Sequence, residues 1–177
     1  MDKIYWSSIE TACREDLEKG QLEDLKATID RALNTEFYGK RLKAEGIESG
    51  NDIKSIDDLK RIPYTTKQDL RSAYPYGLLS LPLEDVVRIH VSSGTTGIPT
   101  VIYHSRDDLD SWTELGARSI IATGASKRDV FQNMMTYGLF TGGLGLHYGA
   151  ERVGMLVIPA SSGNTQRQIK LMRDFGT

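Results

Sequence analysis

The sequence predicts an α/β fold: a helical N-terminal appendage, then part of a mostly parallel sheet with flanking helices. Before residue 80, apolar residues recur at helical spacing, whereas after it short apolar segments alternate with amphipathic ones. Hydrophobic residues make up 39% of the 177 residues, which suffices for a packed core. We therefore expect a helical region over residues 1–80 and the first part of an α/β domain over residues 81–177.

The composition excludes several classes of protein. With 22 basic and 24 acidic side chains the net charge is −2, which gives no electrostatic case for binding nucleic acid or a membrane surface. Cys13 is the single cysteine, so an internal disulfide cannot form, and no histidine, cysteine or carboxylate spacing predicts a metal site. The N-terminus lacks the apolar core of a signal peptide, and no apolar run approaches the length of a membrane span. A cytoplasmic location is expected.

The first 80 residues carry helix signals. Residues 10–34 place five apolar side chains on one helical face, with Gly20 as a point where the segment could divide. Two short helices should follow, because Ser55 precedes Asp58 and Thr66 precedes Asp69 at capping-box spacing. Pro75 and Gly77 should end the second of them.

Strands and helices should alternate in the rest of the chain. Apolar segments at residues 86–91 and 101–103 flank a polar loop and predict a hairpin. Ser105 should cap a helix that ends at Gly124, with Gly116 allowing close approach to a sheet. Strands are expected at 130–135 and 155–159, with a helix at 142–152 between them and a last helix capped by Thr165. This order predicts right-handed crossovers and a parallel sheet.

The polar loop is the part of the chain most suited to bind a ligand. Glycines let the backbone turn its N–H groups inward, and hydroxyl groups add donors for phosphate oxygens. The loop is not of the Walker type, because it lacks the Gly-Lys-Ser/Thr ending and leads into a strand. A plain hairpin connection has the same composition, so the residue types alone leave the two interpretations even. The residues concerned are Ser92, Ser93, Gly94, Thr95, Thr96, Gly97 and Thr100.

The sequence around this loop resembles the phenylacetate–CoA ligase family of the adenylate-forming superfamily. The resemblance rests on SSGTTG at residues 92–97 and on motifs in the same order elsewhere, from about Trp6 to Phe175. Ile98 stands where the family usually has lysine. The other motifs are DL at 58–59, IP at 62–63, TK at 66–67, YP at 74–75, YGLFTGGLG at 137–145, HYGAER at 147–152 and VIP at 157–159.

The resemblance implies a ligase that adenylates an aryl acid with ATP and Mg²⁺ and transfers the acyl group to CoA. Residues 81–177 would then begin its nucleotide- and substrate-binding domain, with the loop binding the ATP phosphates. By the same similarity, a wall of the acid pocket is expected at Tyr137, Phe140, Gly143 and Gly145, although glycines serve close helix–sheet packing equally well. His90 and His147 are expected to be hydrogen-bonded structural residues, and Glu151 and Arg152 a solvated or ion-paired helix end.

The chain stops after a helix, where the alternation of elements requires another strand. We therefore expect a fragment whose catalytic residues belong to a later part, and which is inactive when isolated. The expected partners are an aryl acid, ATP and CoA, with no nucleic acid and no membrane, and a homo-oligomer is compatible with the sequence. The alternative is a non-catalytic nucleotide-binding or interaction domain derived from the same fold.

Overall fold

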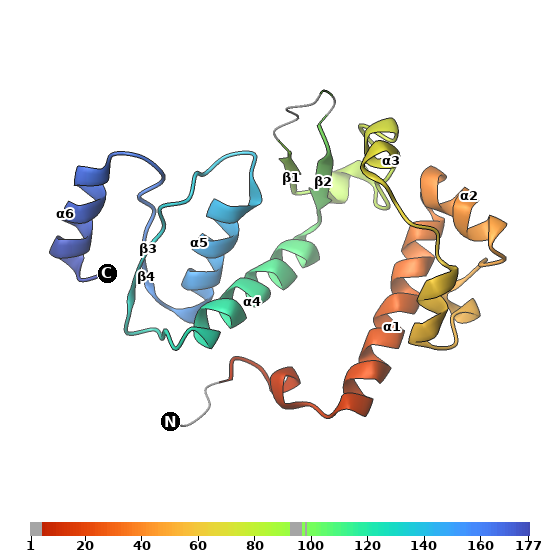
Figure 1. The fold of residues 1–177 in the computed structure, drawn as a ribbon, viewed down its shortest axis with the longest axis horizontal. Helices are drawn as coiled ribbons and strands as arrows, with labels where there is room; N and C mark the ends of the chain where they lie inside the picture. Colours follow the sequence, from red (N-terminus) through yellow and green to blue (C-terminus); the bar gives the residue numbers. More distant parts are fainter. Residues whose placement is uncertain (1–4, 93–96, 98) are drawn as a thin grey trace. The chain divides into compact units, whose positions relative to one another are not determined.

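The structure is a computed structural model that describes residues 5–92, 97 and 99–177 (Figure 1). It divides into two units, which are considered separately. The N-terminal helical unit comprises residues 12–86 and 91–103, and the α4–α5 unit comprises residues 1–11, 87–90 and 104–177. The α/β fold class is confirmed.

The N-terminal helical unit is built on α1 (Arg14–Leu33) and α2 (Glu36–Ala44). The predicted helix start at residue 10 is wrong, since a 3-10 turn (Ser8–Thr11) precedes α1. Gly20 does not divide the helix: α1 continues through it, because a glycine lowers helix propensity without removing a backbone hydrogen bond. The core of this unit consists of Ile29, Leu42, Ile47 and Ile53.

The capping boxes predicted at Ser55 and Thr66 are present, and the predicted cap Ser105 also forms a box, with Asp108. Ser55 and Asp58 begin a 3-10 helix (Ile56–Arg61), and Thr66 and Asp69 begin α3 (Lys67–Ser72). In a further, unpredicted box, Ser49 and Asp52 begin the 3-10 turn Gly50–Asp52. In each box the carboxylate accepts backbone N–H groups that the helix leaves unsatisfied.

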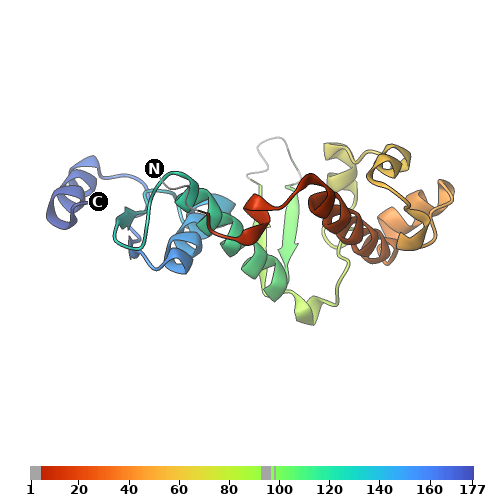
Figure 2. The same ribbon diagram turned by 90° about the horizontal axis from the view of Figure 1, so that it is seen from below.

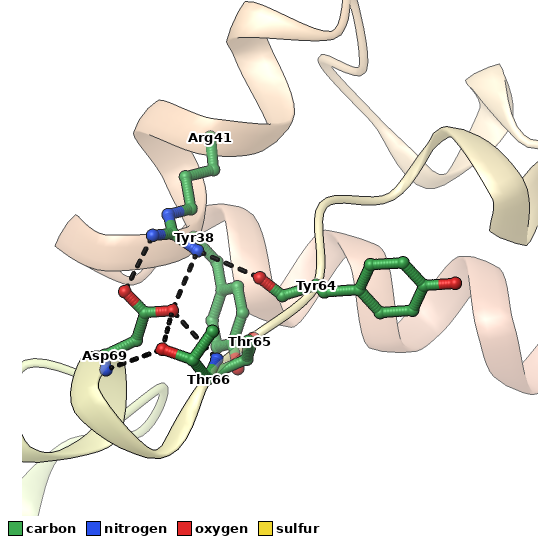
Figure 3. A network of polar contacts seen from close by, with 6 residues as sticks. All are labelled: Tyr38, Arg41, Tyr64, Thr65, Thr66 and Asp69. Atoms are coloured by element: carbon green, nitrogen blue, oxygen red, sulfur yellow. Dashed lines mark hydrogen bonds and ion pairs between the residues drawn. The ribbon is translucent and has the colours of Figure 1, made fainter.

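The Asp69 carboxylate also fixes α3 to α2 (Figure 3). Arg41 donates to both carboxylate oxygens, at 2.8 and 3.4 Å, and to the carbonyl oxygen of Tyr64 at 3.1 Å. Hydrogen bonds from Thr66, with Arg41 adding to them, hold the pKa of Asp69 below its ordinary value. The same carboxylate therefore begins α3 and binds it to its neighbour.

In the α4–α5 unit, α4 (Arg106–Ala122) and α5 (Thr141–Val153) cross in close contact. A Cβ atom added at Gly149 would lie 2.7 Å from the carbonyl carbon of Gly116, so neither position has room for a side chain. The expectation that Gly116 faces a sheet is wrong: its neighbour is a helix. The core beyond this crossing comprises Ala117, Ile120, Ile121, Ala150, Val153 and Met155.

Two parallel strands accompany these helices. β3 (Val130–Gln132) pairs with β4 (Leu156–Ile158) in the register Val130–Leu156, and both lie beside α5 (Figures 1 and 2). Each strand is shorter than predicted. The described part of the chain contains two sheets, each with two strands. One sheet is the β3–β4 pair, and the other joins β1 (Arg88–Val91) to β2 (Val101–His104).

The last helix, α6 (Thr165–Phe175), is capped by Asn164 and not by Thr165 as expected. The Asn164 side chain accepts the N–H of Arg167, and its own backbone is left-handed with φ +48°. Asparagine tolerates that conformation better than a β-branched threonine does. None of the described helices is both long and apolar enough to cross a membrane.

Candidate functional site

Ser92 and Thr100 close the base of the predicted phosphate loop. The Ser92 N–H donates to the Thr100 carbonyl at 2.9 Å, and the Thr100 N–H and hydroxyl both donate to Ser92 Oγ, each at 2.9 Å. The Ser92 hydroxyl hydrogen takes no part in these bonds. The two residues therefore hold the loop ends together and leave one O–H donor unused by them.

Gly97 is the other loop residue that the structure describes. Its φ of +118° is a conformation that other L-residues rarely adopt, and no described atom lies within 4 Å of the position a Cβ would take. Ser93, Gly94, Thr95, Thr96 and Ile98 lie outside the described residues. Phosphate binding by the loop therefore stays a prediction.

Asn133 organises the segment that carries the predicted acid pocket. This side chain is 1% exposed, and its Nδ2 donates to the Gly143 carbonyl at 2.7 Å and to the Tyr137 hydroxyl at 2.8 Å. Its Oδ1 accepts the Met135 N–H at 3.0 Å. A single buried amide thus ties Tyr137 to the first turns of α5.

The Tyr137 hydroxyl continues this network to His147. Its oxygen lies 3.0 Å from His147 Nδ1, and His147 Nε2 lies 3.0 Å from a carboxylate oxygen of Glu151. The two ring nitrogens of His147 thus face the Tyr137 hydroxyl on one side and the Glu151 carboxylate on the other. Burial is the main cause of the raised pKa of Tyr137. His147 is hydrogen-bonded as expected, and its structural role stays a prediction.

The remaining predicted pocket residues have different surroundings. Phe140 is the residue before α5, and its side chain is 51% exposed. Gly143 is buried, and a Cβ there would lie 2.5 Å from the Thr136 carbonyl oxygen. At Gly145 a Cβ would lie 2.5–2.6 Å from three atoms of the Trp112 indole. The structure therefore joins Tyr137 and Gly143 through Asn133, whereas Gly145 accommodates Trp112.

Trp112 belongs to an aromatic cluster with two histidines. Its indole stacks on His104 with a centroid distance of 5.4 Å, and His90 meets it edge-on at 5.3 Å. His90 is buried, and its Nδ1 lies 2.9 Å from the Leu139 carbonyl oxygen, so it is hydrogen-bonded as expected, while its structural role stays a prediction. Burial, with His90 adding to it, lowers the pKa of His104. The cluster joins β1 to the segment that carries Tyr137 and Phe140.

Sequence reasoning assigned no role to Asn133 or to Trp112. The signal for Asn133 was an amide, next to Gln132, inside an otherwise apolar segment (VFQNMM), where an unpaired polar group would be costly. Trp112 carried no comparable signal, because its partners come from three other elements. The ion-paired end of α5 is confirmed: Arg152 pairs with Glu114 and lies 3.6 Å from Asp110.

Comparisons with known proteins bear on this site. The chain is 48% identical over 168 residues to phenylacetate-coenzyme A ligase of Escherichia coli (strain K12), which is 94% of this chain and 38% of that protein. It is 45% identical over 175 residues to the enzyme of the same name from Pseudomonas putida, with coverages of 98% and 40%. The chain thus spans about two fifths of the length of these relatives. No family model matches it.

Solved structures agree with the sequence comparison. 2-Hydroxyisobutyryl-CoA ligase, solved in complex with 2-HIB-AMP and CoA in the thioesterification state, matches with a TM-score of 0.80 and 26% identity. That match covers 92% of this chain and 35% of the other. The resemblance to this group of ligases is therefore confirmed over nearly the whole chain.

Proposed function

We propose that the chain, a relative of the N-terminal part of the phenylacetate–CoA ligases, belongs to an ATP-dependent ligase that joins an aryl acid to CoA. The observation that carries the proposal is the 45–48% identity to four ligases of that name over 94–98% of this chain. The neighbouring structure with an acyl-AMP and CoA supports the two-step chemistry. Neither comparison favours a non-catalytic domain.

In the first step, a carboxylate oxygen of the acid attacks the α-phosphorus of ATP. The bond from the α-phosphorus to the bridging oxygen breaks, and pyrophosphate leaves with that electron pair. In the second step the CoA thiol displaces AMP from the acyl group and gives up its proton. The attacking groups belong to the substrates, so the protein's task is to position them and to stabilise developing charge.

The loop based on Ser92 and Thr100 is proposed to bind the β- and γ-phosphates. Its closed base would present the intervening backbone N–H groups and the Ser92 O–H to the phosphate oxygens. Mg²⁺ is proposed to enter as the complex with ATP. No group of three histidine, cysteine or carboxylate side chains suited to a metal ion occurs in the described residues, so no step is assigned to a protein-bound metal.

The acid is proposed to bind beside Tyr137, Phe140, Gly143 and Gly145. The Tyr137 hydroxyl is occupied by Asn133 and His147, which leaves the ring as its contribution to an aromatic acid. The exposed ring of Phe140 offers a second apolar surface. A phenylacetate-like acid suits a pocket with these walls.

Two further expectations remain part of this proposal: a cytoplasmic location, and the division into regions 1–80 and 81–177. A homo-oligomer is compatible with it. The near-neutral net charge favours small-molecule partners over nucleic acid or membranes.

The test is pyrophosphate exchange into ATP, which reports adenylation alone. In the full-length protein that carries these residues, replacing Thr95 and Thr96 together by alanine should slow exchange by about 10²-fold or more, as expected for lost charge-stabilising donors. Ile98→Lys is the matched control in the same loop and should not weaken ATP binding. Wild-type exchange by the double variant would contradict the loop assignment, and no exchange by the parent protein with any aryl acid would contradict the function.

A further inference from the structure

A polar cavity with a volume of about 460 Å³ lies wholly within the α4–α5 unit. Its walls come from the first two turns of α4, the last two turns of α5 and Arg88 at the start of β1. None of the residues predicted to bind ATP phosphates or the acid lines it. The charged and aromatic side chains that line it are Arg88, Arg106, Asp110, Tyr148, Glu151 and Arg152.

The acidic side chains of this cavity already have partners. Asp110 lies 3.6 Å from Arg152, which also pairs with Glu114. A carboxylate oxygen of Glu151 lies 3.0 Å from His147 Nε2. Neither carboxylate forms an ion pair with Arg88 or Arg106 in the described part of the chain, and the three arginines of the lining outnumber its two carboxylates.

Arg88 and Arg106 form no ion pair among the residues that the structure describes. The Arg88 guanidinium lies over the Tyr148 ring, 5.1 Å from its centroid. Its Nη1 is buried and has no hydrogen-bond partner within the described part of the chain. A buried, charged donor without an acceptor costs free energy, which an anion in the cavity would offset.

We propose that this cavity binds the phosphate group of a phosphorylated small molecule, with Arg88 and Arg106 as its cationic ligands. The guanidinium fork matches phosphate oxygens in a bidentate arrangement, and two guanidinium groups match a dianion. Tyr148 holds Arg88 in place by cation–π contact. The volume lies within the range of small-molecule sites. The site is additional to the proposed function and does not depend on it.

The test uses calorimetric binding to the full-length protein in the absence of any carboxylic acid substrate. The probes are inorganic phosphate and adenosine 3′,5′-bisphosphate. Comparing them shows whether the cavity binds a free phosphate ion or needs a phosphate group carried by a nucleotide. Arg88→Met and Arg106→Gln each remove one guanidinium, and Arg173→Gln is the control, because it removes an equal charge from the exposed face of α6. Circular dichroism and a thermal melt establish that each variant is folded.

Both cavity variants should bind at least one probe about tenfold more weakly or worse, as expected for a lost charge-assisted hydrogen bond, and the control should match the parent protein. Loss confined to the bisphosphate assigns the phosphate to a nucleotide, and loss for inorganic phosphate as well assigns a general phosphate site. Folded variants that bind both probes like the parent protein overturn the proposal, as does an equal loss in Arg173→Gln. Because ATP exchange is not part of the readout, failure of the ligase assignment would leave this result interpretable.

Discussion

Replacing Asn133 by alanine should destabilise the α4–α5 unit more than any surface change, because one buried side chain satisfies three groups. It donates to the Gly143 carbonyl and the Tyr137 hydroxyl and accepts the Met135 N–H, at 2.7, 2.8 and 3.0 Å. Alanine removes all three bonds and keeps the backbone bonds of residue 133 to Ile158 and Ser161.

The expected loss of unfolding free energy depends on which hydrogen bonds each partner of Asn133 keeps in the variant. Tyr137 keeps its contact with His147, so its loss is small. The Gly143 carbonyl keeps its helical bond from the N–H of residue 147, and the Met135 N–H belongs to an exposed residue that water can reach. Three hydrogen bonds worth about 0.5–1.5 kcal/mol each are nevertheless lost, so we expect a loss of about 1–3 kcal/mol, with the lower end applying if water enters the space.

The assay is urea denaturation of the parent and variant proteins, with the free energy of unfolding extrapolated to water. Asn51→Ala is the matched control, since this exposed asparagine makes no side-chain hydrogen bond to any described residue, and it should change stability by less than about 0.5 kcal/mol. The KM for the aryl acid should also rise in Asn133→Ala, because Tyr137 loses its anchor. An unfolding free energy equal to that of the control would refute the reasoning.

Two further predictions concern the cluster beside Gly145. Gly145→Val should lower the free energy of unfolding by about 1–3 kcal/mol, because the added side chain displaces Trp112. It should also lower kcat/KM more for phenylacetate and benzoate than for short aliphatic acids. Equal losses of kcat/KM for every acid would assign Gly145 to packing alone. Because the pKa of His104 is lowered in the folded state, the unfolded state binds the proton more readily. The contribution of His104 to the free energy of unfolding is therefore complete above the ordinary pKa of 6.5. It is lost as the pH falls through the lower pKa of the folded state. The urea midpoint should therefore fall when the pH is lowered from about 7 to about 5. The variant His104→Phe keeps a ring against Trp112 and should show a smaller fall over the same pH range. Identical pH profiles of the two proteins would contradict this prediction.

The sequence determined the features that depend on neighbours along the chain. The boxes at Ser55, Thr66 and Ser105 were predicted correctly, because a capping side chain and the backbone N–H that donates to it lie three residues apart in any helix start. The alternation of short apolar segments and helices after residue 80 was also sufficient to predict the parallel pairing of β3 and β4. The prediction that Thr165 caps the last helix was wrong, because the neighbouring Asn164 is also a good capping residue and provides the cap instead.

Tertiary structure alone decided which surfaces meet. Gly116 signalled a close approach, but only the folded chain shows that its partner is Gly149 of α5 and not a strand. Likewise, glycines at 143 and 145 looked equivalent in the sequence, yet one contacts backbone and the other an indole from α4. The bonds of Asn133 to Tyr137 and Gly143, and the position of Arg88 over Tyr148, arise because side-chain contacts between elements depend on packing, which a pattern of residue types does not encode.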